Sequence, residues 1–125
     1  MKVLLIDDDV DDQEIFSMAI EDSRSEAECI FAKDGIHALE QIHGNPEFIP
    51  DFIFIDMNMP RMNGKECLIE LKKIDRLRNV PIFMYSTSSD PFNKSENIKL
   101  GATGFIVKPS DIKDLTSILD ELLIK

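Results

Sequence analysis

Short apolar runs alternate with amphipathic segments along the chain. Five runs rich in β-branched and aromatic residues predict strands, and they span residues 2–6, 28–32, 52–56, 81–85 and 105–107. The third run places four consecutive large apolar residues between Pro50 and a loop rich in Pro, Asn and Gly, which is typical of a strand buried on both faces. Asp56 then stands at the C-terminal end of that strand.

Apolar residues between these runs recur at spacings of three and four, which predicts helices. The helices are expected over 10–22, from 36, after a turn at 33–35, to the Gly-Asn-Pro sequence at 44–46, from Gly64, over 91–100 with Asp90 as N-cap, and from 112 to the terminus. The helix 91–100 is poorly amphipathic, so the pattern assigns it no inner face. In the second and third helices, the expected inward residues are Ile36, Leu39, Ile42, Leu68, Leu71 and Ile74. In the first and last helices, the residues at helical spacing are Ile15, Phe16, Ala19, Ile20, Ile112, Leu115, Leu119 and Leu122.

Five strands alternating with five helices predict a doubly wound α/β domain with right-handed crossovers. The commonest small version has a parallel sheet with the flavodoxin-like strand order 2-1-3-4-5 and helices on both faces. Strands one and three are then neighbours, and the crevice where ligands bind lies at their C-terminal ends. We expect a single domain over residues 1–125, without repeats or linkers.

Composition narrows the class of protein. The 14 basic and 24 acidic residues give a net charge of −10, which argues against binding nucleic acid through a basic face. The apolar run at 3–6 is too short for a signal peptide or a membrane span, so we expect a cytoplasmic protein. Cys29 and Cys67 follow neither a metal-binding nor a redox spacing, and free buried thiols are the simplest interpretation.

Polar residues follow the strands at the edge where ligands bind. These are Asp7 and Asp8, Asp56, Ser86 and Thr87, and Lys108. Three carboxylates brought together repel one another unless a cation lies between them, and a few hard oxygen ligands suit a partly hydrated Mg²⁺. Lys108 and Ser86 would neutralise and hydrogen-bond the oxygens of a phosphoryl group at Asp56.

Five motifs occur in order along the whole chain. They are Ile6-Asp7-Asp8, Asp56-x-Asn58-Met59-Pro60, Asn63-Gly64, Ser86-Thr87 and Lys108-Pro109. On these residues the chain resembles the receiver domains of bacterial two-component response regulators, and in particular the stand-alone chemotaxis type. The resemblance implies a signalling module of a phosphorelay.

The resemblance also implies roles for single residues at the site. Asp56 would be the phosphoacceptor. Asp8 and Asp56 would bind Mg²⁺ directly together with the backbone carbonyl of Asn58, and Asp7 would contribute through water. Asn58 and Ser88 would tune the lifetime of the phosphoryl group.

A second group of residues would carry the switch. Ser86 takes the position of the switch hydroxyl, with Thr87 as the alternative one residue later. Phe105 takes the position of the switch aromatic, and without a hydroxyl its inward rotation would be a packing event. Lys108-Pro109 is expected to form a cis peptide that aims the lysine.

The expected partners follow from the same family. A sensor histidine kinase or phosphotransfer protein would supply the phosphoryl group, and a downstream protein would bind the helix 91–100, the fifth strand and the last helix. The chain would not be an enzyme beyond its own phosphorylation and dephosphorylation, and it would contact neither nucleic acid nor membrane. Because it ends with the last helix, we expect the output to come from a partner protein.

Other interpretations remain. The residues Asp9, Asp11 and Asp12 are expected to be a solvated helix start favoured by the helix dipole. An FMN protein would need a Ser/Thr/Gly-rich phosphate cradle after the first strand, and a dehalogenase-type phosphatase would need Asp-x-Asp-x-Thr and a cap. A degenerate receiver that binds partners without phosphate is the alternative that keeps the fold, although the acidic cluster and Lys108 argue against it.

Overall fold

The computed structural model describes residues 1–87 and 90–124. Its strands form one parallel five-stranded sheet in the order β2-β1-β3-β4-β5, which confirms the predicted topology. The strands are β1 (Lys2–Ile6), β2 (Glu28–Ala32), β3 (Phe52–Asp56), β4 (Ile82–Ser86) and β5 (Gly104–Val107).

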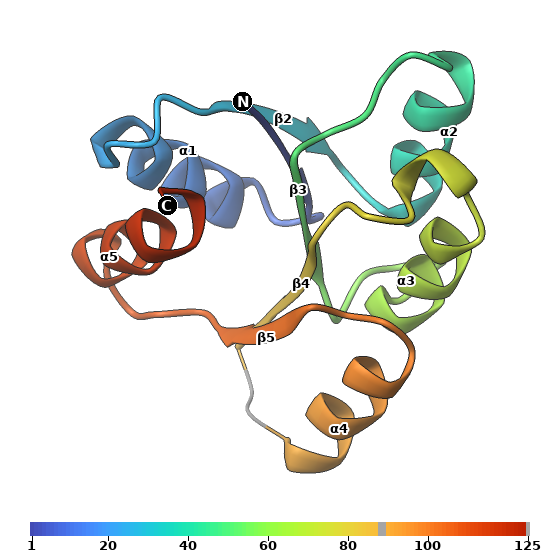
Figure 1. The fold of residues 1–125 in the computed structure, drawn as a ribbon. Helices are drawn as coiled ribbons and strands as arrows, with labels where there is room; N and C mark the ends of the chain where they lie inside the picture. The colour runs from blue at the N-terminus through green and yellow to red at the C-terminus, as the bar shows by residue number, and fades with distance from the viewer. Residues whose placement is uncertain (88–89, 125) are drawn as a thin grey trace.

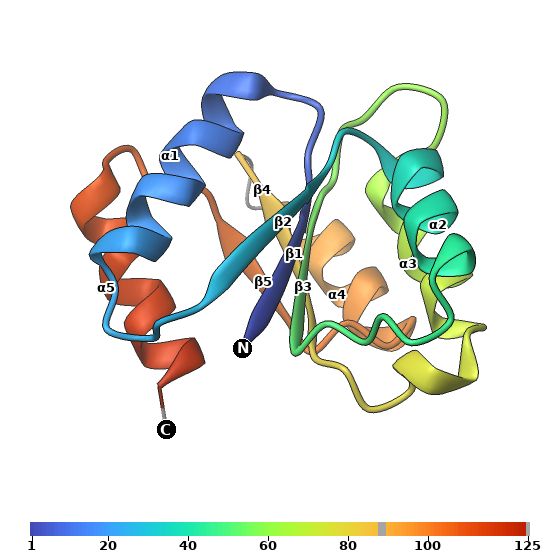
Figure 2. The same cartoon turned by 90° about the horizontal axis from the view of Figure 1, so that it is seen from above.

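Helices cover both faces of the sheet. They are α1 (Val10–Asp22), α2 (Gly35–Gly44), α3 (Gly64–Lys72), the 3-10 turn η1 (Asp75–Leu77), α4 (Pro91–Lys99) and α5 (Ile112–Leu123). Figures 1 and 2 show α1 and α5 on one face and α2, α3 and α4 on the other. The three-layer arrangement follows from strands that are apolar on both sides.

Successive residues of each strand pack into different cores, because side chains alternate across a sheet. In β3, Ile53 and Ile55 belong to the core beneath α2 and α3. Phe54 belongs to the core beneath α1 and α5, where its ring meets Phe16 edge-on with centroids 5.2 Å apart. Both cores are therefore anchored on the central strand.

Element boundaries differ from the predictions by one or two residues. Strand β4 begins one residue late and includes Ser86. Ile74 lies beyond the end of α3, where it still packs against the core. In the middle of α2 the buried position is Ala38, whereas Ile36 and Leu39 are only partly buried.

The register of the sheet brings the two acidic strand ends together. Ile6 of β1 pairs with Ile55 of β3, so Asp7 and Asp56 leave the sheet side by side. Gly64 lets α3 begin directly against this edge, because a Cβ at that position would lie 2.5 Å from the carbonyl oxygen of Asp56. A side chain at 64 would push α3 away from the strand end.

Within the described ranges 1–87 and 90–124, no helix has the length and apolar character needed to cross a membrane.

Candidate functional site

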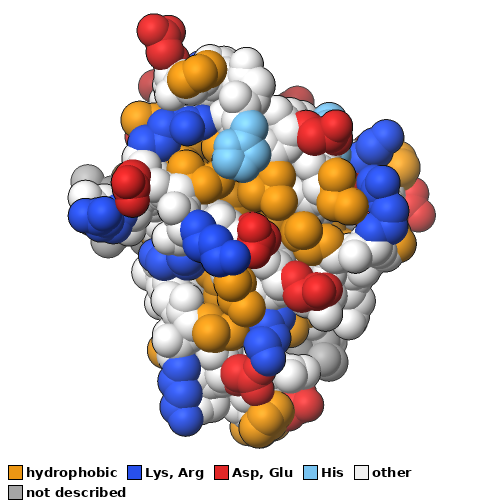
Figure 3. All heavy atoms as spheres, turned by 90° about the vertical axis from the view of Figure 1, so that its right-hand side faces the viewer, with side chains coloured by type: hydrophobic (Ala, Val, Ile, Leu, Met, Phe, Trp, Pro, Cys, Tyr) orange, Lys and Arg blue, Asp and Glu red, His pale blue; other side chains and the backbone are white. Residues whose placement is uncertain are grey.

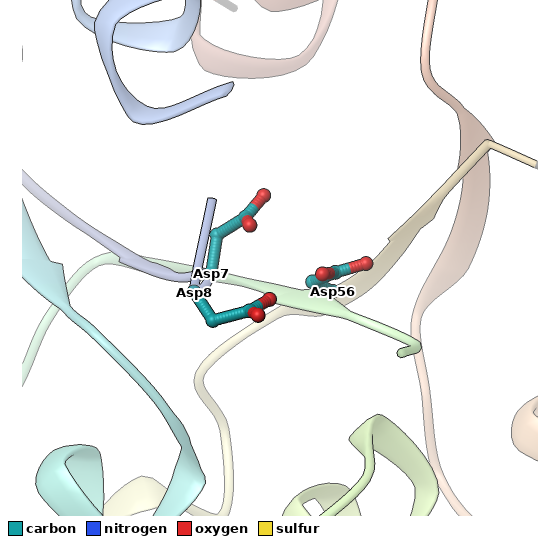
Figure 4. Close-up of side chains that lie close together, drawn as sticks. All are labelled: Asp7, Asp8 and Asp56. Atoms are coloured by element: carbon teal, nitrogen blue, oxygen red, sulfur yellow. The ribbon is translucent and has the colours of Figure 1, made fainter. Parts of the chain in front are cut away.

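Three carboxylates meet at the carboxyl ends of β1 and β3. Asp7 and Asp8 follow β1, and Asp56 is the last residue of β3. Figure 4 shows their carboxyl groups gathered at this edge, and one oxygen from each lies within 4.8 Å of the others. Asp7 and Asp56 are buried, whereas Asp8 is exposed. The sequence prediction that these three residues converge is confirmed.

The loop after β1 is held by hydrogen bonds to Asp7. The backbone N–H of Asp7 donates to the carbonyl of Ala32 in β2 (3.1 Å), which extends the sheet by one residue. The Asp7 carboxylate accepts from the N–H of Asp9 (2.9 Å), and Asp9 in turn caps α1. Asp9 is thus the N-cap of α1, and the Asp8 carboxylate takes no part in capping the helix.

Lys108 brings a positive charge into the acidic cluster from the end of β5. Its Nζ lies 2.7 Å from Asp12, 3.1 Å from Asp7 and 3.5 Å from Asp56. It also lies 5.1 Å from the centre of the Tyr85 ring, which supports the cation from β4. Because only 8% of the Lys108 side chain is exposed, these groups form its immediate environment.

Burial and charge shift the protonation of this cluster. Burial, with the charges of Asp7 and Asp8, raises the pKa of Asp56 from 3.8 to about 6, although Lys108 and the Asn58 N–H oppose the shift. Burial likewise raises the pKa of Asp7. Burial alone would lower the pKa of Lys108, but the hydrogen bond with Asp12 and the charges of Asp7 and Asp56 hold it above its ordinary value. Lys108 is therefore a permanent cation.

The loop that follows Asp56 is fixed to its surroundings by side chains. The N–H of Asn58 points to the Asp56 carboxylate (3.4 Å). Arg61, with φ of 66°, reaches across to form an ion pair with the buried Asp34, the N-cap of α2. Burial alone would raise the pKa of Asp34, but the hydrogen bond from the His37 N–H and the guanidinium of Arg61 hold it below its ordinary value.

The residues predicted for the switch lie on β4 and β5. Ser86 is buried, and its carbonyl accepts from the Lys108 N–H (2.6 Å). Thr87 is exposed. Phe105 pairs with Met84 and is partly buried against the core beneath α2 and α3. Ser88, predicted to tune phosphoryl lifetime, lies outside the described residues.

The expected cis peptide before Pro109 is wrong. No cis peptide bond occurs among residues 1–87 and 90–124, so Lys108-Pro109 is trans. The trans form is favoured by about 0.5–1 kcal/mol at bonds to proline. The hydrogen bond from the Lys108 N–H to Ser86 and the ion pairs of its ammonium form with this isomer.

Sequence reasoning missed Asp12. It was interpreted as part of a solvated helix start, but its carboxylate makes the shortest contact with Lys108. One signal was present: Asp12 lies in the first turn of α1, soon after Asp7 at the strand end. Tyr85 carried no such signal, because its contact with Lys108 depends on the pairing of β4 and β5.

The donor set fits a hard divalent cation. Carboxylate oxygens of Asp7, Asp8 and Asp56 can supply part of an octahedral shell, and the few protein ligands leave positions for water, as Mg²⁺ prefers. Charge supports the same fit, because Lys108 balances one carboxylate while the Asp8 carboxylate lies exposed at the edge.

Comparison with known proteins agrees with this geometry. Residues 3–120 match the response regulator receiver domain family. The chemotaxis protein CheY of Thermotoga maritima is 34% identical over 100 residues, covering 80% of this chain and 82% of that protein. The structure of the phosphorylated cyanobacterial phytochrome response regulator RcpA superimposes with a TM-score of 0.85 at 26% identity, over 97% of this chain and 89% of that one.

A further relative contains the matched region as one part of a longer protein. The protein-glutamate methylesterase/protein-glutamine glutaminase 1 of Methanospirillum hungatei is 33% identical over 122 residues. The match covers 98% of this chain but only 35% of that protein. The likeness therefore concerns about a third of that protein. Receiver domains of this kind act in two-component signalling, and this chain belongs to the response regulator receiver domain family.

Proposed function

We propose that Asp56 accepts a phosphoryl group from a sensor histidine kinase or a phosphotransfer protein. The observation that carries this proposal is the position of the Asp56 carboxylate, which lies close to the carboxylates of Asp7 and Asp8 and 3.5 Å from the ammonium of Lys108. A nucleophilic carboxylate beside a fixed cation is the arrangement that phosphoryl transfer needs. The phosphorylated state of RcpA supports the same chemistry.

The transfer uses groups that the fold already holds at this edge. An oxygen of Asp56 forms the new bond to phosphorus while the P–N bond of a phosphohistidine breaks and its imidazole leaves. Lys108, 3.5 Å from Asp56, neutralises charge on the phosphoryl oxygens. The Ser86 hydroxyl, on the next strand, donates a hydrogen bond to them.

Asp8, Asp56 and the backbone carbonyl of Asn58 would hold Mg²⁺ directly, and Asp7 would contribute through water. The ion would supply positive charge that offsets the repulsion between the carboxylates and the incoming phosphoryl group. The Asp34–Arg61 ion pair helps to keep the loop carrying Asn58 against the site. Asn58 and Ser88 would tune the lifetime of the phosphoryl group through access of water.

The phosphoryl group would switch a protein-binding surface formed by α4, β5 and α5. Ser86 would move toward the phosphoryl oxygens, and Phe105 would rotate inward into the space behind β4. Phe92 and Val107 on this surface are 70% and 44% exposed. Helix α4 also carries a shallow pocket of about 440 Å³ lined by Pro91, Lys94, Ser95, Ile98 and Lys99.

The stretch of chain that carries α3 and α4 differs in charge from the rest. Residues 61–99 contain eight lysines and arginines and five acids, within a chain of net charge −10. Figure 3 shows hydrophobic side chains lying among basic ones on the side of the molecule that lies to the right in Figure 1. Electrostatic steering would bring an acidic partner toward this stretch of chain, and so toward α4.

The remaining parts of the proposal concern the chain as a whole. Residues 1–125 would form a single receiver domain in the cytoplasm. Its only chemistry would be its own phosphorylation and dephosphorylation, and it would act without nucleic acid or membrane. A downstream protein would read the phosphorylated state.

The test is phosphorylation of the purified chain by acetyl phosphate with Mg²⁺, followed by intact-mass measurement. We expect one hydroxylamine-labile phosphoryl group, lost when the metal is chelated and absent from Asp56→Asn. Asp11→Asn, an exposed aspartate nearby in α1, is the matched control and should be modified normally. Normal modification of Asp56→Asn would overturn the assignment, and an unmodified wild-type chain would favour the degenerate receiver.

A further inference from the structure

Helix α4 is attached to the fold in an unusual way. Its only buried side chain is the amide of Asn97, which is 1% exposed. Its large apolar side chains Phe92 and Ile98 are 70% and 42% exposed. Surface helices normally dock through an apolar stripe, so the attachment of α4 depends to an unusual degree on this one amide.

The amide of Asn97 has one strong partner, one weak partner and one unsatisfied atom. Its Nδ2 donates to the carbonyl of Asn93 (2.7 Å) and lies 3.4 Å from the sulfur of Met57. Its Oδ1 is buried, and no residue in the described part of the chain donates to it. If the Nδ2 and Oδ1 of Asn97 were exchanged, Oδ1 would face the carbonyl oxygen of Asn93. The hydrogen bond to Asn93 therefore fixes the orientation of the Asn97 amide.

Met57, which Asn97 contacts, lies beside the proposed phosphoacceptor. Met57 directly follows Asp56, and its carbonyl accepts from the N–H of Gly64 at the start of α3 (3.0 Å). Glu96, the neighbour of Asn97, forms an ion pair with Lys65 of α3. Two adjacent residues of α4 therefore contact the stretch from Met57 to Lys65, which follows Asp56.

We infer that Asn97 is a positioning residue that couples the chain after Asp56 directly to α4, by a route separate from Ser86 and Phe105. The inference rests on the proposed phosphorylation of Asp56. A shift of the backbone at Met57 changes the contact of its sulfur with Asn97. The unsatisfied oxygen makes the docked position of α4 less favourable than an apolar anchor would, so a small shift at Met57 is enough to release the helix.

The first test compares Asn97→Ala with Asn93→Ala, which alters the same residue type one turn earlier and keeps the backbone carbonyl. Alanine favours helix and removes an unsatisfied oxygen, so Asn97→Ala is expected to fold. Amide chemical shifts are recorded before and after phosphorylation with acetyl phosphate and Mg²⁺. In the wild type and Asn93→Ala, the changes should reach α4. In Asn97→Ala, they should fall to about half or less at α4 but persist at Ser86 and Phe105.

The second test needs no phosphorylation. Hydrogen exchange of the α4 amides should quicken by about tenfold in Asn97→Ala, and Asn93→Ala should match the wild type. A double-mutant cycle of Met57→Leu with Asn97→Ala should show that the two effects on exchange are not additive, as expected for residues in contact. If Asn97→Ala fails to fold, Asn97→Ser, whose shorter side chain lacks the amide that contacts Met57, serves in both tests.

The outcomes separate the two proposals. Normal phosphorylation with an unaltered response of α4 in Asn97→Ala, or unchanged exchange in that variant, would overturn the coupling alone. A wild-type chain that takes up no phosphoryl group would overturn the proposed function and the coupling with it.

Discussion

Lys108 lies closer to Asp12 than to Asp56. Its Nζ is 2.7 Å from the Asp12 carboxylate and 3.5 Å from that of Asp56. The cation assigned to the phosphoryl group is therefore shared with the first turn of α1. For Lys108 to move fully onto a phosphoryl group at Asp56, it must loosen its contact with Asp12.

Removing the competing carboxylate should help phosphorylation. Asp12→Asn keeps the side-chain shape but weakens the hold on Lys108 by about 0.5–1 kcal/mol, because Asp12 is partly exposed. We expect Asp56 to accept a phosphoryl group from acetyl phosphate roughly two to five times faster. The rate is measured by intact mass against Asp11→Asn. A slower reaction in Asp12→Asn would show that Asp12 supports Lys108 instead of competing for it.

Mg²⁺ binding should distinguish a direct ligand from a neighbouring charge. Asp8→Ala removes a carboxylate of the cluster and should weaken Mg²⁺ binding by at least about tenfold. Asp12→Asn should change it by no more than about threefold, since this carboxylate is paired with Lys108. Calorimetric titration measures both. Equal losses would mean that the total charge of the cluster, not Asp8, determines affinity.

The raised pKa of Asp56 predicts a pH-dependent cost to stability in metal-free protein. The folded state binds this proton more tightly than the unfolded state, with a pKa of about 6 against 3.8. Asp56 therefore costs the folded state nothing below about pH 4, where its carboxyl is protonated in both states. The cost of burying the charged carboxylate is complete once the pH has risen through 6. Asp56→Asn should be more stable than the wild type by about 3 kcal/mol at pH 8, and most of the difference should be gone near pH 4.

Urea unfolding in a chelating buffer at both pH values checks this prediction. Added Mg²⁺ should reduce the difference at pH 8, because it binds the wild type. If Asp56→Asn proved the less stable protein at pH 8, the contact with Lys108 would outweigh the burial of the Asp56 carboxylate.

Arg61 combines a left-handed backbone with an ion pair to Asp34. Arg61→Ala and Arg61→Gly both remove the ion pair, but only glycine relieves the positive φ of 66°. We expect Arg61→Ala to be less stable than Arg61→Gly by about 1 kcal/mol. Thermal or urea unfolding measures the difference. Equal stability would mean that the loop changes conformation once Arg61 loses its partner.

Ser86 should be needed for the response but not for phosphorylation. Ser86→Ala keeps Asp56 and the acidic cluster, so acetyl phosphate should still modify the protein. The change in the amide chemical shift of Phe105 on phosphorylation should then become smaller. The reason is the loss of a coupling of about 1–3 kcal/mol between Asp56 and Phe105. Thr87→Ala, altering the exposed neighbour, is the control and should respond as the wild type does. Loss of the response in Thr87→Ala alone would assign the switch hydroxyl to Thr87.

Much of the fold and part of the site could be predicted because the signals are local. Strands that are apolar on both faces, alternating with amphipathic helices, determine a doubly wound sheet. Once β1 and β3 are neighbours, Asp7, Asp8 and Asp56 must share one edge. The sequence pattern alone therefore predicts that those three residues lie together.

What the sequence by itself determined is the class of fold, the strand order and the edge at which the acidic residues meet, because periodicity and strand ends are properties of short segments. Only the tertiary structure decided the partners across that edge. The contact of Lys108 with Asp12 joins residues 96 positions apart, and that of Asn97 with Met57 joins residues 40 apart. The burial of Asn97 and the trans bond at Pro109 likewise depend on how packed elements surround those residues, and no local pattern records that packing.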